Sequence, residues 1–279
     1  DELIAGLVPD NAGRIEPESG AVLLDHDPSG TGTSEQQLPG ADIRRIVVSD
    51  MVGDAVPEVV LVDVGDPDDG GTSPLGVYRW NGGALAVLFE IQTTRAVDAA
   101  VFDADGDGDM DLVVLSGGAA GDTLESSATV AWLQSGGSLG DAGVTPAATN
   151  PGATRLTAAD LNADGDTELV VSNFVDDAGS FENMLRLFEV TASGRITLSG
   201  SRDLPTLGSR GQVVADLDGD GDLDIASGAW SDDAGSGRVD SRLFWNGGGA
   251  TLSDAFRSLD RTELTTTAIW ADPVVVGAD

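Results

Sequence analysis

An acidic segment that recurs about every 56 residues constrains this chain more than any other feature of its sequence. The clearest copies read DADGDGDMDLVV from Asp103, DLNADGDTELVV from Asp160 and DLDGDGDLDIAS from Asp216. A weaker copy, DMVGDAVPEVVL, begins at Asp50, and a vestige, ADPVVV, places Asp272 in the same register. The first aspartates of successive copies are 53, 57, 56 and 56 residues apart. Repeats of this length are typical of propeller blades and similar arrays.

A second landmark keeps the same register. Each of the first four copies is followed, 28 to 30 residues later, by an aromatic residue beside a Gly-rich stretch. These residues are Trp80, Trp132, Phe188 and Trp245. Asn-Gly follows two of them between apolar runs, and this pair favours the type I′ turn of a β-hairpin. We expect the three tryptophans to be packing residues.

The repeat predicts an all-β fold. An apolar run enters each acidic segment, a second leaves it and an aromatic hairpin follows, so each unit is expected to form four antiparallel strands. The sequence therefore predicts a β-propeller of about five four-stranded blades in one domain, residues 1–279. The predicted blades comprise residues 43–92, 93–150, 151–204, 205–264, and 265–279 together with 1–42.

The two ends of the chain complement each other in this scheme. Residues 265–279 look like the first two strands of a blade, and residues 20–38 look like an outer hairpin without inner strands before it. Their pairing would close the ring and remove exposed sheet edges. A segment cut from a longer propeller is the alternative that the sequence leaves open. His26, the only histidine, falls at the predicted turn of this hairpin, where we expect an exposed side chain and no catalytic base.

The acidic segments have the spacing of calcium ligands. Carboxylates or an amide occupy positions 1, 3, 5 and 9, small residues allow a tight path, and the carbonyl at position 7 can turn inward. Such a loop supplies the six to eight oxygens that calcium takes, whereas magnesium demands stricter octahedral geometry. Without a cation the carboxylates would repel one another. About three Ca²⁺ ions are therefore expected, with these ligands: Asp103, Asp105, Asp107, Asp109 and Asp111; Asp160, Asn162, Asp164, Asp166 and Glu168; Asp216, Asp218, Asp220, Asp222 and Asp224.

The copy that begins at Asp50 is predicted to be a weak or empty site. Val52 stands at its third position, which leaves only Asp50, Asp54 and Glu58 as acids. Around Asp272 the segment has collapsed to Asp-Pro, and no site is expected. An EF-hand is excluded, because its loop needs a Glu at position 12 and a helix on either side, and position 12 here is valine or serine in a strand-like run.

With these loops and this spacing, residues 43–279 resemble the FG-GAP/VCBS-type repeats, the blades of integrin α-like propellers. The resemblance implies a calcium ion in the loop that joins the first two strands of a blade. It also implies an extracellular setting and roles in adhesion or carbohydrate binding. Propellers of this family often have seven blades, so a count of five departs from the family's pattern.

The strongly negative net charge limits the kinds of partner that the chain can bind. The chain carries 48 acidic and 14 basic residues, a formal net charge of −34, and every basic residue is arginine. A polyanionic surface disfavours nucleic acid, and no run approaches the roughly 18 apolar residues of a membrane span. Metal binding and adaptation of the surface to salt are both open as causes of the acidity. The predicted location is extracellular or at the cell surface, with the periplasm as an alternative; the absence of cysteine fits each of these.

Two aromatic residues are candidates for ligand contact. Phe174 in NFVDDAGS and Trp230 in AWSDDAGS lie one repeat apart, each beside paired aspartates. Aromatic faces next to hydrogen-bonding acids suit a sugar, while packing between neighbouring blades is the alternative use of the same side chains.

Three functions remain. No G-x-S-x-G elbow, P-loop or H-E-x-x-H motif is present, so we expect a non-catalytic binding or adhesion module for a glycan or an extracellular protein. A structural subunit of a cell-surface or extracellular assembly is the first alternative. A polysaccharide-cleaving enzyme, either a glycoside hydrolase or a lyase, is the second.

Overall fold

The computed structural model describes the parts of the chain that carry the repeats. These are residues 3–6, 21–26, 33–38, 43–65, 72–81, 84–116, 128–135, 138–141, 152–174, 180–181, 184–191, 195–196, 202–230, 241–249, 251, 256 and 261–264. Every regular element among them is a β-strand, which confirms the all-β prediction. Within these residues there is accordingly no helix that could cross a membrane.

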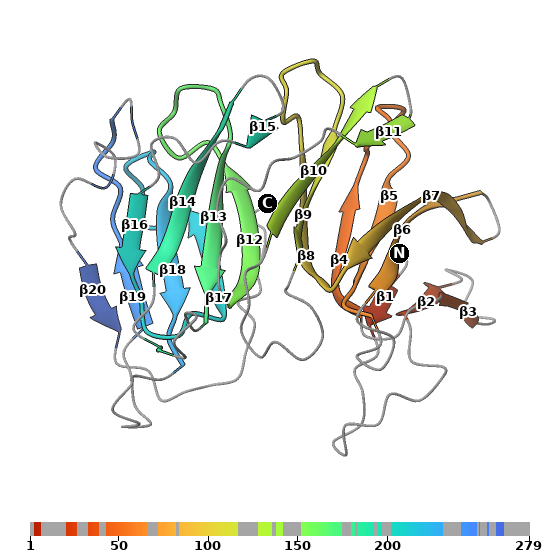
Figure 1. The fold of residues 1–279 in the computed structure, drawn as a ribbon, viewed down its shortest axis with the longest axis horizontal. Coiled ribbons are helices and arrows are strands. Elements are labelled where there is room, and N and C mark those ends of the chain that lie inside the picture. The colour runs from red at the N-terminus through yellow and green to blue at the C-terminus, as the bar shows by residue number, and fades with distance from the viewer. Residues whose placement is uncertain are drawn as a thin grey trace.

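The strands pair into a three-stranded N-terminal sheet and four larger antiparallel sheets (Figure 1). The N-terminal sheet contains β1 (Leu3–Gly6), β2 (Ala21–His26) and β3 (Thr33–Leu38). The first large sheet contains β4 (Ile43–Ser49), β5 (Glu58–Asp63), β6 (Thr72–Trp80) and β7 (Leu85–Thr94). The second contains β8 (Ala96–Phe102), β9 (Asp111–Ser116), β10 (Ala128–Ser135) and β11 (Ser138–Asp141). The third contains β12 (Ala153–Ala159), β13 (Glu168–Asn173), β14 (Met184–Thr191), β15 (Arg195–Ile196) and β16 (Arg202–Pro205). The fourth contains β17 (Gly211–Ala215), β18 (Asp224–Gly228), β19 (Ser241–Phe244) and β20 (Arg261–Leu264).

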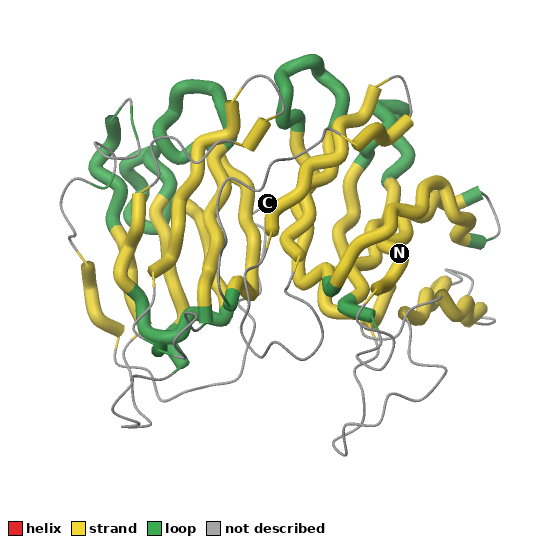
Figure 2. Tube along the Cα trace, in the orientation of Figure 1, coloured by secondary structure: helices red, strands yellow, loops and turns green. Residues whose placement is uncertain are grey.

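Each large sheet holds one sequence repeat, with its strands paired in chain order. The third sheet alone departs from this order, since β15 and β16 both pair with β14. The acidic segment of each unit connects the first strand of its sheet to the second. These four connections, the first to fourth acidic loops, lie along one edge of the molecule, the upper edge in Figure 2. All four candidate metal sites are therefore on the same side of the fold.

The large sheets pack face to face. Their second strands β5, β9 and β13 are buried at every position. Because successive side chains of a strand point to opposite faces, Val113 and Leu115 of β9 join a core cluster with Leu169 of the third sheet. Leu112 and Val114 of the same strand join a cluster with the first sheet. A strand between two apolar layers has no solvated face, which explains the unbroken apolar runs that leave the acidic loops.

The first strands β4, β8, β12 and β17 lie next to one another in that order. A buried hydroxyl chain joins the third and fourth sheets there: Ser209 Oγ lies 2.9 Å from Ser172 Oγ and 2.8 Å from Ser227 Oγ. The closed five-bladed ring stays a prediction, because residues 265–279, including Asp272, lie outside the described residues.

The predicted N-terminal hairpin is present. β2 and β3 pair from Ala21 opposite Leu38 to His26 opposite Thr33. His26 therefore ends a strand just before the turn, and its side chain lies outside the described part. Leu38 is buried in a cluster with the first large sheet.

The prediction of a tight Asn-Gly hairpin after Trp245 is wrong. β19 ends at Phe244, and its partner β20 begins only at Arg261. Asn246 is 2% exposed, and its Nδ2 donates to the carbonyls of Leu161 at 2.7 Å and Leu223 at 3.1 Å. The asparagine is thus used to join two acidic loops, and its amide is unavailable for a tight turn. The equivalent pair at Asn81 does belong to a hairpin, because Trp80 pairs with Leu85.

Candidate metal centres

The four acidic loops follow one backbone path although their sequences differ. Positions 4 and 6 of every loop have positive φ. The residues at these positions are Gly53 and Ala55, Gly106 and Gly108, Ala163 and Gly165, and Gly219 and Gly221. An L-residue in this left-handed region is strained by roughly 1–2 kcal/mol. The alanines with φ of 67° at Ala55 and 55° at Ala163 therefore show that the loop imposes its conformation even where glycine is absent.

The aspartate at position 1 organises this path. Asp103 Oδ1 accepts the N–H of Gly106 at 2.8 Å, and its Oδ2 accepts the N–H of Gly108 at 2.9 Å. Asp216 holds the fourth loop in the same way. Each loop is wrapped around its first carboxylate, so the chain's own hydrogen bonds shape the site.

The acid at position 9 is buried and anchored. One of its oxygens accepts the N–H of the second loop residue, at 2.8 Å in the first three loops and 3.0 Å in the fourth. These acids are Glu58, Asp111, Glu168 and Asp224, each no more than 1% exposed. A buried carboxylate needs a compensating charge or further hydrogen bonds. The four loops meet this need in different ways.

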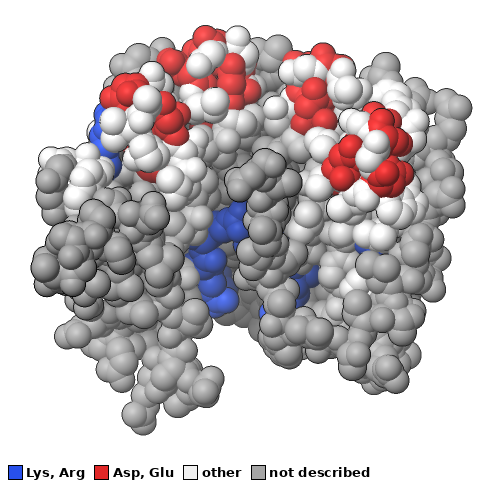
Figure 3. Space-filling view, turned by 180° about the vertical axis from the view of Figure 1, so that it is seen from behind, with Lys and Arg blue, Asp and Glu red and all other residues white. Residues whose placement is uncertain are grey.

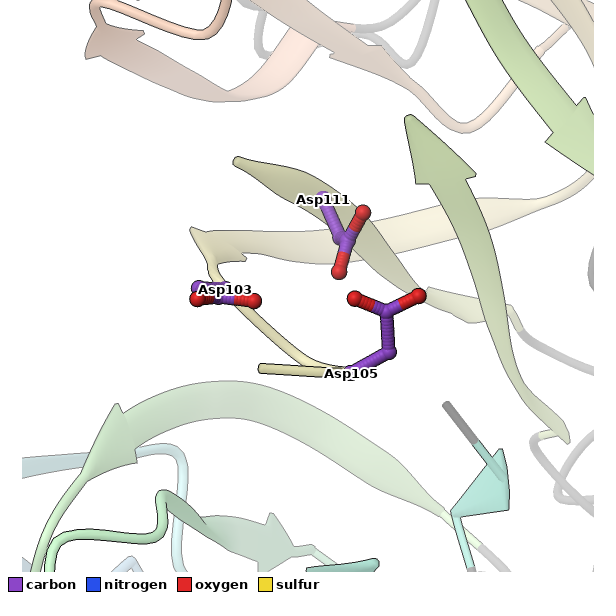
Figure 4. Close-up of side chains that lie close together, drawn as sticks. All are labelled: Asp103, Asp105 and Asp111. Carbon is purple, nitrogen blue, oxygen red and sulfur yellow. The ribbon is translucent and has the colours of Figure 1, made fainter. Parts of the chain in front are cut away.

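In the second and fourth loops, three carboxylates converge. One oxygen each from Asp103, Asp105 and Asp111 lies within 4.8 Å of the other two, and Asp216, Asp218 and Asp224 form an equivalent triad. Figure 4 shows the side chains of the first triad turned toward one another. Oxygens bound at 2.3–2.6 Å to one calcium ion lie at most about 5 Å apart. The donor set and its spacing therefore fit calcium.

The third loop has a mixed donor set. Asn162, 8% exposed, replaces the third-position acid, and its Oδ1 accepts the N–H of Asp164 at 3.1 Å. Burial raises the pKa of Glu168 to about 7, and the nearby carboxylates of Asp164, Asp160 and Glu189 add to this rise. Acids that disfavour one another's charge in this way are held close together. Among the described residues its carboxylates form no triad like those of the second and fourth loops, so a calcium ion in the third loop stays a prediction.

An arginine compensates the first loop. Arg79 on β6 forms a hydrogen bond and ion pair with Asp54, and its Nε lies 3.3 Å from Oε1 of the buried Glu58. The bond from Arg79 lowers the pKa of Asp54. The residue opposite the ninth-position acid is Arg79 in this sheet, whereas in the third sheet it is Glu189. A guanidinium therefore supplies charge that the other loops would receive from an ion.

The remaining predicted ligands shape the turn. Asp107, Asp164 and Asp220 at position 5 each accept the N–H of the seventh residue, at 2.9, 2.9 and 3.0 Å. The Asp222 side chain is directed toward Gly248, where a Cβ would lie 2.7 Å from its Oδ2. This direction is consistent with position 7 offering its carbonyl, although ligation by positions 5 and 7 stays a prediction.

Figure 3 shows the acidic side chains as separate groups along the loop edge. Two residues that contact the acidic loops were not predicted: Arg79, which pairs with acids of the first loop, and Asn246, which joins the third and fourth loops. Aligning the four units offers a signal for Arg79, because only the unit with the fewest acids has an arginine directly before its aromatic landmark. Asn246 offers none, since Asn-Gly predicts a turn.

The aromatic candidates Phe174 and Trp230 lie together where the third and fourth sheets meet. Their ring centroids are 6.2 Å apart with planes at 67°, and Phe174 also packs edge-on against Phe181 at 5.2 Å. Trp230 is 36% exposed. Packing between sheets is thus one use of these rings, while contact with a ligand stays a prediction. The aspartates that follow each of them lie outside the described residues.

Comparison with known proteins matches part of the chain to a repeat family. Residues 103–171, which span the second and third acidic loops, match the FG-GAP-like repeat family. Among solved structures, the chain is similar to the crystal structure of the V. cholerae biofilm matrix protein Bap1, with a TM-score of 0.41 and 14% sequence identity. That similarity covers 87% of this chain and 36% of the other, so this chain spans about a third of that protein's length. No curated protein sequence matches the chain.

Proposed function

Since residues 103–171 match the FG-GAP-like repeat family, we propose that this chain is an extracellular or cell-surface, calcium-stabilised module for binding or adhesion, without catalytic activity. In this proposal its sheets are blades of a propeller of about five units. The observation that carries the proposal is the pair of carboxylate triads in the second and fourth loops, with oxygens within 4.8 Å of one another. Extracellular modules bind calcium at about 10⁻⁴–10⁻³ M, a range that suits sites built from exposed loops.

Calcium would be held by the second, third and fourth loops, and its role would be structural. It would balance the buried acid at position 9 of each loop and join the first two strands of each sheet at one edge. At a concentration ten times Kd, each ion adds about 1.4 kcal/mol to the free energy of unfolding. Three ions would contribute about 4 kcal/mol in total, a large fraction of the 5–15 kcal/mol typical of a domain.

The ligand would be a glycan or an extracellular protein partner. A metal-stiffened edge and face-to-face sheets give a rigid scaffold, and exposed Trp230 beside Phe174 offers aromatic surface for recognition. A structural subunit of a surface assembly is the alternative, and it would show a protein interface without a small ligand. We expect no cleavage of polysaccharide, because the clustered acids are engaged in shaping their own loops.

The experiment is calorimetric titration of the chelator-treated chain with calcium and with magnesium, together with thermal melts in each. We expect about three calcium ions per chain and a higher melting temperature in calcium, with magnesium weaker. An unchanged melting temperature in a folded chain would overturn the proposal. Screening of the calcium-loaded chain on glycans and on surface proteins then separates the two classes of partner.

A further inference from the structure

Arginines are gathered at the end of the first strands that lies opposite the acidic loops. Five of the 14 arginines stand within the first three residues of such a strand or directly before it: Arg44, Arg45, Arg95, Arg155 and Arg210. The strands concerned lie next to one another. Seen from behind in Figure 3, arginine atoms form patches near the middle of the molecule, below the row of acidic groups. Positive charge is therefore concentrated in one place on a chain of net charge −34.

One buried carboxylate serves two of these arginines. Asp98 on β8 is fully buried, and its oxygens lie 3.4 Å from Arg45 Nε and 3.9 Å from Arg155 Nε. The same oxygens accept the N–H groups of Ala99 and Leu156 at 2.9 and 2.8 Å. One negative charge thus faces two guanidinium groups, and the Arg45 side chain is 42% exposed. Arg45 therefore presents its charge to solvent, whereas the side chain of Arg155 is 16% exposed.

Arg210 has aromatic neighbours. Its guanidinium carbon lies 4.1 Å from the ring centroid of Phe174 and 4.7 Å from that of Trp230. Among the described residues, no carboxylate forms an ion pair with it. Burial lowers the pKa of Arg210, and the charge of Arg44 adds to this effect, although an arginine remains charged at neutral pH.

The backbone that carries Arg210 is fixed from both sides. Ser209 is fully buried, and its carbonyl accepts the hydroxyl of Thr154 at 3.1 Å. The N–H of Trp230 donates to the carbonyl of Leu207 at 3.0 Å. Arg210 and Arg155 therefore begin adjoining strands, and the guanidinium stacked on two rings is held before any ligand arrives. Such preorganisation reduces the entropy lost on binding.

We propose that Arg210, together with Arg155 and Arg45 at the same end of the row of first strands, binds an acidic polysaccharide, pairing with its uronate carboxylates while a sugar ring packs on the exposed part of Trp230. The planar guanidinium matches a carboxylate in a two-bond geometry. The exposed ring, whose face is electron-rich, suits the C–H face of a sugar better than it suits an acidic peptide. This inference rests on the proposed function as a binding module, and it names the ligand class.

The test uses the calcium-loaded chain and short probes that do not gel: hexagalacturonate, its methyl ester, and hexaglutamate. Binding is followed by calorimetry and by tryptophan fluorescence at low ionic strength. We expect hexagalacturonate to bind and the ester, which keeps the sugar but lacks the charge, to bind at least about tenfold more weakly. Affinity for hexagalacturonate should fall with added salt, since exposed charges are screened. Tighter binding of hexaglutamate would overturn the choice of a polysaccharide in favour of an acidic peptide.

Variants locate the site. Arg210→Gln is expected to weaken hexagalacturonate binding about tenfold or more, and Arg210→Lys to restore only part of it, because lysine lacks the planar fork. Arg186→Gln is the matched control. Arg186 lies on β14 and pairs with the exposed Asp203, so this variant removes the same charge at another place. It should change the affinity for hexagalacturonate less than about twofold. Equal losses in both variants would show a non-specific charge effect and overturn the site.

Calcium itself binds carboxylates, so hexagalacturonate binding is also measured in chelator, at a temperature where the chain stays folded. Binding should persist there; its loss in chelator, with Arg210→Gln unaffected in calcium, would place the ligand on the acidic loops and overturn the inference. Absence of binding in a chain whose melting temperature still rises with calcium would overturn this inference alone. Absence of the calcium response would overturn the proposed function.

Discussion

The first and fourth acidic loops share a backbone path but compensate their charge differently. Both place residues of positive φ at positions 4 and 6, and both bury an acid at position 9. In the fourth loop, Asp216, Asp218 and Asp224 converge on one another. In the first, Arg79 pairs with Asp54 and Glu58. The same loop conformation therefore forms around two charge arrangements: a guanidinium beside the acids in the first loop, and a carboxylate triad that would suit a cation in the fourth.

The largest expected effect comes from removing the built-in cation. Arg79→Ala leaves Glu58 buried without its partner, and loss of one member of a buried pair costs up to 3–5 kcal/mol. Because Arg79 is itself 25% exposed, we expect a loss of about 2–3 kcal/mol in urea unfolding. The loss should be of similar size in calcium and in chelator, in contrast to any change in the fourth loop.

A matched control for Arg79 lies in the third sheet. Arg186→Ala removes an arginine whose partner Asp203 is 49% exposed, and such surface pairs contribute about 0–1 kcal/mol. Equal losses in the two variants would contradict a compensating role for Arg79.

The next effect tests whether the third and fourth loops act together. Asn246→Ala removes the amide that bonds the carbonyls of Leu161 in the third loop and Leu223 in the fourth. Leaving a buried carbonyl unpaired costs about 1–3 kcal/mol, so we expect about 2 kcal/mol in chelator and weaker calcium binding by both loops. Asn81→Ala, at the equivalent but exposed position, should cost less than about 1 kcal/mol. Calorimetry that finds one weakened site would show that the loops bind independently.

Removal of a single ligand should matter only when calcium is present. Asp218→Asn is expected to lower stability by about 1.4 kcal/mol at a calcium concentration ten times Kd, and to leave stability in chelator unchanged or higher, because like charges no longer face one another. The control is Asp203→Asn on the outer strand β16, which removes one negative charge outside the acidic loops. A calcium-independent loss in Asp218→Asn would mean that the fourth loop resembles the first.

The sequence predicted what depends on local spacing. Positions 1, 3 and 9 of the second and fourth loops converge as their register requires, because each site is built from one short segment. The apolar runs that leave the loops predicted strands in the same local way, and these strands are buried between sheets. Contacts between segments distant in sequence were not accessible in this way. Arg79 reaches the first loop from the third strand of its sheet, and Asn246 bonds Leu161 of the preceding repeat, 85 residues earlier in the chain.

The smallest effect concerns the shared path itself. Ala163 holds φ of 55° at a position where the second and fourth loops have glycine. Ala163→Gly relieves this strain but gives the unfolded chain more freedom, so the net gain should be about 0.5–1 kcal/mol in chelator. Ala55→Gly, with φ of 67° in the first loop, should give a similar gain. Because the third loop is expected to bind calcium and the first is not, only Ala163→Gly should also tighten calcium binding. Tighter binding after Ala55→Gly would mean that the first loop also takes an ion, and that Arg79 does not replace one.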